Sequence, residues 1–313
     1  MDRRRVVLVG ALVVMLSGSL ISAEVADAKL QTKLETMAAQ HRGKVALWAK
    51  NLQTGDVVAL NADQPVQTAS VIKLPIMLEA IYQVKAGKHS LGEKMKLTKD
   101  NQVPGSGVLQ FMDPGLELTL KDTIALMMIL SDNTATNMTI DMLGVNAVNE
   151  RIAAMGLKNT HLYKKVFKPV DPKDAPLPDD YKKFGLGKTT AREMGEAIAS
   201  LHRCDLGDKD LCTTMIDIMK SQDYRNMIPH YIESSDTTEH PSAIADKLGA
   251  LDDVRNDVAL VYTKNGPLVI SAFTWDNKDQ SWTMENEAEL LIARMAKVII
   301  DTWSPKGVAQ PAK

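Results

Sequence analysis

A serine and a lysine stand three residues apart in the segment QTASVIKLPIM, which covers residues 67 to 77. Positions i and i+3 of a helix share a face, so Lys73 would lie beside Ser70. A serine hydroxyl is a weak nucleophile until a base takes its proton, and a lysine surrounded by apolar groups has a lowered pKa and can be that base. The same spacing also suits a helix that is capped by Thr68 or Ser70 and carries a lysine that extends to solvent.

Two further polar groups follow in the chain. SDN at residues 131–133 comes directly after an apolar run at 120–130, and DKLGA at residues 246–250 lies in a predicted strand. Each has a local explanation, because Ser, Asp and Asn are favoured at helix starts and Lys and Gly at strand edges and bulges. Together and in this order, the three groups match the SxxK, SDN and KTG set of penicillin-recognising serine enzymes, with leucine in place of threonine in the third.

From about residue 30 to residue 303 the chain resembles the class A β-lactamase-like family. The resemblance extends to the segments "GSGVLQFMDPGLELTLKDTIALMMILSDNTATNMTIDMLG", "GKTTAREMGEAI", "MIPHYI" and "DVRNDVALVYT". It implies a β-lactamase/transpeptidase-like fold of the α/β plus all-α class, in which an antiparallel sheet is flanked by the terminal helices and a helical domain is inserted. It also implies that no cofactor is needed.

The resemblance assigns roles to the residues of the three motifs. Ser70 would be the acylated nucleophile, Lys73 its base, and Ser131 the relay that protonates the leaving nitrogen. Asn133 would bind the substrate's side-chain amide and help to position Lys73. The other implied substrate-binding groups are Lys247 for the substrate carboxylate, and Gly249 with Ala250, whose backbone N–H forms the oxyanion hole with that of Ser70.

The third motif departs from the family, because Leu248 stands where a hydroxyl residue is usual. A lost hydrogen bond to a charged group is worth about 1.5–3 kcal/mol, which weakens carboxylate recognition roughly ten- to a hundredfold. Lys247 still attracts an anion, so we expect an altered substrate preference.

A second departure lies in the loop at residues 164–178, which occupies the place of the family's Ω-loop. The family's glutamate, which activates the water that hydrolyses the acyl-enzyme, is absent, since no glutamate occurs between Arg151 and Ala191. Asp171 and Asp174 are the nearest candidate bases. The alternative is that both are solvated charges that balance the lysines of this loop.

These features leave several functions open. The first is an exported β-lactam hydrolase, and the second is a DD-peptidase or penicillin-binding protein that β-lactams acylate with slow turnover. An esterase and a non-turnover sensor of β-lactams or cell-wall peptides are further alternatives. A net charge of −2 gives no basic field for nucleic acid, and the six histidines form neither HExxH nor HxH, so we expect no metal.

The elements that must position these residues change character along the chain. Strands are predicted at 44–50 and 56–60 and again at 243–248, 258–263 and 268–274, with helices at 30–39, 70–84, 120–130 and 285–303. We therefore expect a discontinuous sheet domain interrupted by a helical domain. The predicted limits are 29–65 and 205–305 for the sheet domain, 66–204 for the helical domain and 306–313 for a tail.

Three arginines at positions 3–5 precede an apolar stretch at 6–23, which predicts a signal peptide at 1–28 with cleavage after Ala23 or Ala28. An uncleaved anchor is the alternative, because the stretch approaches spanning length. We expect an exported monomer, periplasmic or secreted, without a stable anchor. Outside the cytoplasm Cys204 and Cys212 can form a disulfide, although two buried thiols are also compatible with the sequence.

Overall fold

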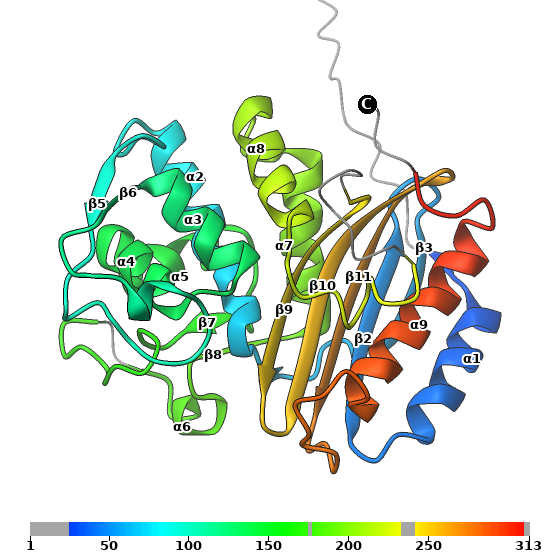
Figure 1. Cartoon of the computed structure of the whole chain (residues 1–313). Helices are drawn as coiled ribbons and strands as arrows, with labels where there is room; N and C mark the ends of the chain where they lie inside the picture. The colour runs from blue at the N-terminus through cyan, green and yellow to red at the C-terminus, as the bar shows by residue number, and fades with distance from the viewer. Residues whose placement is uncertain (1–24, 175–176, 233–241, 310–313) are drawn as a thin grey trace, which may run out of the picture.

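The computed structural model describes residues 25–174, 177–232 and 242–309. A six-stranded sheet lies between a pair of helices on one face and the remaining helices on the other (Figure 1). Its strand order is β1-β3-β2-β11-β10-β9, and all neighbours are antiparallel except the short β1, which pairs in parallel with β3. The strands are β1 (Val25–Ala26), β2 (Lys44–Asn51), β3 (Asp56–Leu60), β9 (Ile244–Leu251), β10 (Val254–Thr263) and β11 (Gly266–Trp275).

The central strand β2 is apolar at five successive positions, 45–49, because both faces of the sheet are covered. Ala46 and Trp48 pack into the core that faces most of the helices, whereas Val45, Leu47 and Ala49 pack into the core on the opposite face. Side chains alternate between the two faces of a strand, so a run of apolar residues fills both cores at once.

The outer face is covered by the two terminal helices, α1 (Ala28–Ala39) and α9 (Glu287–Trp303). Asp27 joins them, since its Oδ1 accepts the backbone N–H of Leu30 and caps α1, while its Oδ2 accepts the indole Nε1–H of Trp303 at 3.0 Å. The start of the described chain is therefore held by the end of α9.

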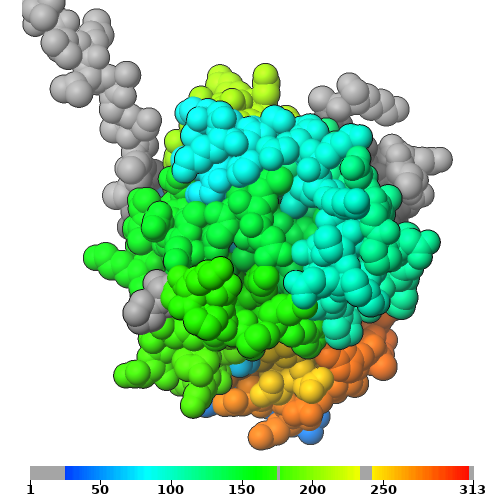
Figure 2. Space-filling model, turned by 90° about the vertical axis from the view of Figure 1, so that its left-hand side faces the viewer, coloured from blue at the N-terminus to red at the C-terminus, as the bar shows by residue number. Residues whose placement is uncertain are grey.

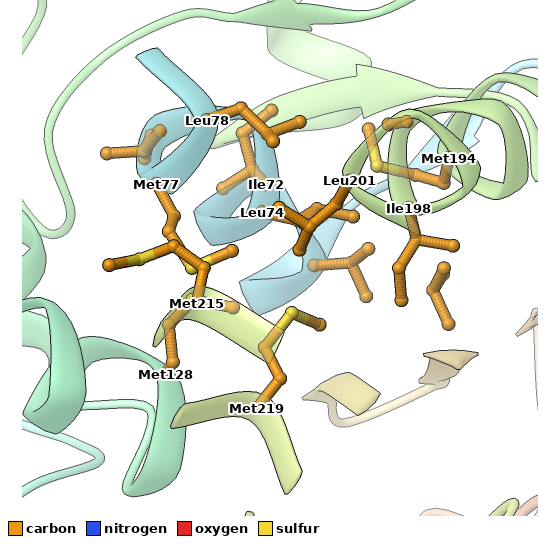
Figure 3. Close-up of a cluster of buried hydrophobic side chains, with 14 of the residues drawn as sticks. Ile72, Leu74, Met77, Leu78, Met128, Met194, Ile198, Leu201, Met215 and Met219 are labelled. Atoms are coloured by element: carbon orange, nitrogen blue, oxygen red, sulfur yellow. The ribbon is translucent and has the colours of Figure 1, made fainter. Parts of the chain in front are cut away.

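The other face meets a helical region whose core is rich in methionine (Figure 3). Helix α7 contacts both the sheet and helices α2 and α8, so no simple boundary separates the two regions, and the domain limits at residues 66 and 204 stay a prediction. The helices are α2 (Lys73–Lys85), α3 (Leu120–Ile129), α4 (Asn133–Leu143), α5 (Val145–Ala154), α6 (Tyr181–Phe184), α7 (Ala191–Arg203) and α8 (Lys209–Lys220).

A disulfide joins Cys204 to Cys212, with their Cα atoms 5.8 Å apart. Cys204 ends α7 in the left-handed conformation, with φ of +53°, and Cys212 lies in the first turns of α8. The alternative of two free thiols is therefore wrong, and the bridge fixes the turn between two helices that both pack near the sheet.

Gly195 marks the point where α7 lies closest to the sheet. A Cβ atom at this position would lie 2.2 Å from Cε3 of Trp48, whose side chain is fully buried and cannot move aside cheaply. Gly195→Ala should therefore lower the free energy of unfolding by about 1–3 kcal/mol in urea titration. Helix propensity alone would raise it by about 1 kcal/mol, so the sign of the change decides between close packing and local propensity.

Candidate active site

Ser70 lies in a 3-10 turn, η1 (Ala69–Ile72), between the short strand β4 (Val66–Gln67) and α2. The predicted helix from residue 70 thus begins as a 3-10 turn and continues as α2. The capping alternative is wrong for Thr68, since its hydroxyl donates to the carbonyl of Gly187 at 3.1 Å and makes no cap. Ala69 has a φ of +44°, a conformation that non-glycine residues seldom adopt and that is typical of functional turns.

Two residues of the sheet contact the backbone at this turn. The amide Nδ2 of Asn256 donates to the carbonyls of Gln67 and Thr68 at 2.9 and 3.2 Å. Gly249 on β9 lies against the turn, where a Cβ atom would stand 2.7 Å from the backbone nitrogen of Ser70. A glycine is therefore required at this position, and Ala250 is the next residue of the same edge strand.

Lys73 follows one turn after Ser70, and its backbone N–H donates to the carbonyl of Ser70. Its side chain is fully buried. The ammonium Nζ donates to the carbonyl of Ser131 at 2.5 Å, to Oγ of Ser131 at 3.0 Å and to Oδ1 of Asn133 at 3.0 Å. The first two predicted motifs therefore meet through direct hydrogen bonds.

The third motif reaches the same hydroxyl from the sheet. Nζ of Lys247 donates to Oγ of Ser131 at 3.2 Å and to the carbonyl of Leu248 at 2.7 Å. Ser131 Oγ thus lies between two lysine amines, and because a hydroxyl accepts through its lone pairs, its own proton is left to donate to a third group. This is the arrangement that a proton relay needs.

Burial dominates the electrostatics of the two lysines. It lowers the pKa of Lys73 well below that of an exposed lysine, the positive charge of Lys247 lowers it further, and Asp132 acts in the opposite direction. Burial also lowers the pKa of Lys247 to about 8, against the effect of Asp246 and Asp257. Lys73 therefore loses its proton more readily than an exposed lysine does, as a general base requires.

The SDN segment is fixed by a loop that the sequence interpretation did not assign. Asp132 caps α4 through the N–H of Ala135, and its Oδ2 accepts the backbone N–H groups of Val108 and Leu109 at 2.7 and 2.9 Å. Ser131 itself has a φ of +52°. The sequence signal that could have indicated this contact is the pair of glycines in the PGSG segment at 104–107. A Cβ atom on Gly107 would lie 2.2 Å from Cγ of Asp132, so a side chain does not fit at this position.

Asn133 is held by the same loop. Its backbone N–H donates to the carbonyl of Ser106 at 3.0 Å, and its Nδ2 donates to the carbonyl of Pro104 at 3.1 Å. The Oδ1 atom is bonded to Lys73, so the orientation of the amide is set from both ends.

The two candidate bases in the loop at 164–178 form hydrogen bonds within the loop. Asp171 is exposed and its Oδ1 accepts the N–H of Lys173, while the N–H of Asp174 donates to the carbonyl of Asp171. Partial burial and the charge of Asp171 raise the pKa of Asp174. Within the residues that the structure describes, neither carboxylate is hydrogen-bonded to Ser70 or Lys73, so the structure brings neither into the cluster.

Leu248 is only 9% exposed and belongs to the core cluster on the α9 side of the sheet. Its apolar side chain is thus explained by packing. No group of three or more His, Cys, Asp or Glu side chains in the described ranges is arranged to hold a metal ion. Nor does the described part of the chain contain a helix of the length and hydrophobicity needed to cross a membrane.

Comparisons with known proteins find a matching family model and similar solved structures. The model of the beta-lactamase enzyme family matches residues 29–303. The structure of PBP-A is 24% identical, with a TM-score of 0.76, over 90% of this chain and 98% of that one. A beta-lactamase from Sphaerobacter thermophilus DSM 20745 is 27% identical, with a TM-score of 0.72, over 88% and 97% of the two chains.

A variant of PBP-A, solved as an acyl-enzyme complex with penicillin G, is 23% identical, with a TM-score of 0.75, over 90% of this chain and 98% of that one. The predicted β-lactamase/transpeptidase-like fold is confirmed by these likenesses.

Tyr163, Asp180 and Lys188 form a hydrogen-bonded cluster, called the clamp below, that joins the chain before the loop at 164–178 to the chain after it. The hydroxyl of Tyr163 donates to Oδ1 of Asp180 at 2.9 Å, and Nζ of Lys188 donates to Oδ2 at 2.6 Å, which lowers the pKa of Asp180. Asp180→Ala should therefore raise amide hydrogen exchange at residues 164–174 by about tenfold. The adjacent Asp179→Ala is the matched control, and equal exchange in both variants would contradict a role for the clamp.

Proposed function

The chain belongs to the beta-lactamase enzyme family, and from that premise we propose that it is an exported serine hydrolase that β-lactams acylate at Ser70. One observation carries the proposal: the buried Nζ of Lys73 lies within hydrogen-bonding distance of Ser131 Oγ and Asn133 Oδ1, one turn from Ser70. A buried amine with a lowered pKa next to a serine is the arrangement that activates a hydroxyl nucleophile.

Acylation follows from these contacts. Neutral Lys73 takes the proton of Ser70 as its Oγ attacks the carbonyl carbon of the β-lactam. When the carbon–nitrogen bond breaks, Ser131 gives its proton to the leaving nitrogen and recovers one from Nζ of Lys73 across the 3.0 Å contact. The proton lost by Ser70 is thus balanced by the proton gained by the product nitrogen.

Three groups would bind the substrate around this step. The backbone N–H groups of Ser70 and Ala250 stabilise the oxyanion at the edge of β9, where Gly249 permits close approach. Lys247 attracts the substrate carboxylate, and Asn133 binds the side-chain amide. Each role is part of the proposal, supported by the positions of these residues around Lys73 and Ser131.

Slow turnover defines the second candidate, a DD-peptidase or penicillin-binding protein whose natural substrate is a cell-wall peptide. The absence of a loop glutamate favours it, and so does the position of Asp171 and Asp174 outside the Lys73 cluster. A sensor would also keep the acyl group. The intact bonds of Lys73 argue against a site that cannot be acylated at all.

Export is the remaining part of the proposal. Residues 1–24 of the predicted signal peptide at 1–28 lie outside the described residues. Of the two cleavage sites, we favour the one after Ala23. Cleavage after Ala28 would remove Asp27, which caps α1 and binds Trp303, and also the pairing of β1 with β3.

Acylation is tested by intact mass with benzylpenicillin. The wild-type protein should gain the mass of one penicillin, whereas Ser70→Ala should gain none because the nucleophile is gone. Lys73→Ala should be acylated at least about a hundredfold more slowly, since general bases contribute about 10²–10⁴. An adduct that persists in Ser70→Ala would place the reaction on another residue and contradict the proposal.

Deacylation is tested by following the decay of that adduct. If Asp171 or Asp174 supplies the base, Asp171→Asn or Asp174→Asn should slow the decay at least about a hundredfold, because the amide cannot accept a proton. Equal decay in both variants and wild type would show that neither carboxylate takes part. A wild-type adduct that persists for hours supports the slow-turnover candidate instead.

Lys247 gives the reaction a specific pH dependence. It is charged below its pKa of about 8, so its attraction for a carboxylate is present at lower pH and lost as pH rises through 8. The second-order acylation rate constant, which reports on the free protein, should therefore fall above pH 8 for benzylpenicillin. The methyl ester of the same penicillin is the control, and the same alkaline fall with the ester would assign it to another group.

A further inference from the structure

A groove of about 810 Å³ lies where α6 meets one end of the sheet, and neither Ser70 nor Lys73 lines it. Its walls come from the end of α1, the start of β2, the loop at 61–67, α6, the turn between β9 and β10 and the end of β11. Figure 1 shows α6 near the lower end of the sheet, and Figure 2 shows green atoms of that segment close to the yellow and orange end of the sheet. We call it the α6 groove. Its volume is within the range of sites that bind small molecules.

An indole ring supplies most of the apolar surface of the α6 groove. Trp275, the last residue of β11, packs against the core on the helical face of the sheet and remains half-buried. Phe184 of α6 also lines the groove, but only 6% of it is exposed. Because Trp275 is held by both its strand and the core, it offers a flat apolar surface to a ligand from a fixed position.

Three side-chain amides line the same groove. Nδ2 of Asn61 donates to the carbonyl of Val45 at 2.9 Å, and Nε2 of Gln67 donates to the carbonyl of Lys183 at 2.9 Å, so both amides are held in place. Within the residues that the structure describes, the oxygen atoms of these two amides have no hydrogen-bond partner, and neither has the amide of Gln64. Amides both donate and accept hydrogen bonds, so they suit a ligand whose hydroxyl groups do the same.

The charges that line the α6 groove cancel. Lys44 and Lys183 contribute two positive charges, and Asp253 and Asp276 contribute two negative ones. Nζ of Lys44 lies 2.7 Å from Oδ2 of Asp276. A balanced set of charges creates no net field that attracts either an anion or a cation. A lipid chain is also unsuitable, because it would remove these polar groups from water without bonding to them. The ligand that fits is therefore neutral and polar, with one apolar face.

We propose that the α6 groove binds a neutral oligosaccharide, with Trp275 stacked on one sugar ring and the three amides bonded to its polar groups. A sugar ring has both kinds of surface, because its C–H groups form an apolar face and its hydroxyls point outward from the edge. A cell-wall glycan strand has this chemistry. The groove wall at Val66 and Gln67 leads directly into the turn of Ser70, so a bound glycan lies against the strand that precedes the candidate nucleophile.

The test titrates the nitrogen-15-labelled protein with two neutral trisaccharides, chitotriose and cellotriose, which differ only in the group at carbon 2 of each ring. The indole N–H signal of Trp275, assigned with Trp275→Phe, should shift with at least one of them. Trp275→Ala should weaken that binding at least about tenfold, because the stacking surface is lost. Gln64→Ala should weaken it about two- to tenfold. Gln64 is exposed and its side chain makes no hydrogen bond within the described residues, so this variant should fold.

Trp282→Ala is the matched control, because this indole is 65% exposed and packs on Arg255 outside the groove. It should leave the affinity unchanged. Failure of both trisaccharides to bind at about 10 mM overturns the inference, as does binding that Trp275→Ala and Gln64→Ala leave unchanged. A shift of the Trp275 signal with a sugar-free cell-wall peptide, and with neither trisaccharide, would assign the groove to a peptide and also overturn it. The test measures binding and not acylation, so its failure is distinct from failure of the proposed function.

Discussion

The burial of one lysine amine is the interaction on which the rest of the site depends. Burying a charged amine without partners is costly, and here the cost is met by three hydrogen-bond acceptors from the SDN segment and by a lowered pKa. The burial that makes these contacts necessary lowers the pKa of Lys73, the charge of Lys247 lowers it further, and both favour its action as a base. Stability and chemistry are thus two consequences of a single placement.

That placement requires the sheet and the helices to meet closely at a few points. Gly249 brings β9 against the nitrogen of Ser70, and Gly195 brings α7 against Trp48. Neither position leaves room for a methyl group. Two of the left-handed non-glycine residues, Ala69 and Ser131, belong to the candidate site, one directly before Ser70 and the other bonded to the Lys73 amine.

Much of the fold and of the candidate site was predictable from the sequence, because the patterns that indicate them lie within short segments. The paired strands at 44–60 and the long helix at the C-terminus follow from periodicity, whereas the three motifs were recognised together by their resemblance to a known family. The 3-10 start at Ser70 was missed because it is imposed by Asn256, which is distant in sequence and whose amide binds the carbonyls before the turn. Helix α7 was assigned to the helical domain since its pattern is helical, but nothing local reveals that it also packs on the sheet.

The central claim is that Lys73 is neutral when Ser70 reacts, and a titration of lysine side chains by nuclear magnetic resonance tests it most directly. With carbon-13 at the lysine Cε atoms and Lys73→Arg to assign the signal, the account predicts a pKa for Lys73 well below that of the surface lysines. It also predicts that Lys247→Ala raises this pKa, because a neighbouring positive charge is removed. A Lys73 signal that titrates near about 10.4, as for an exposed lysine, would contradict the account.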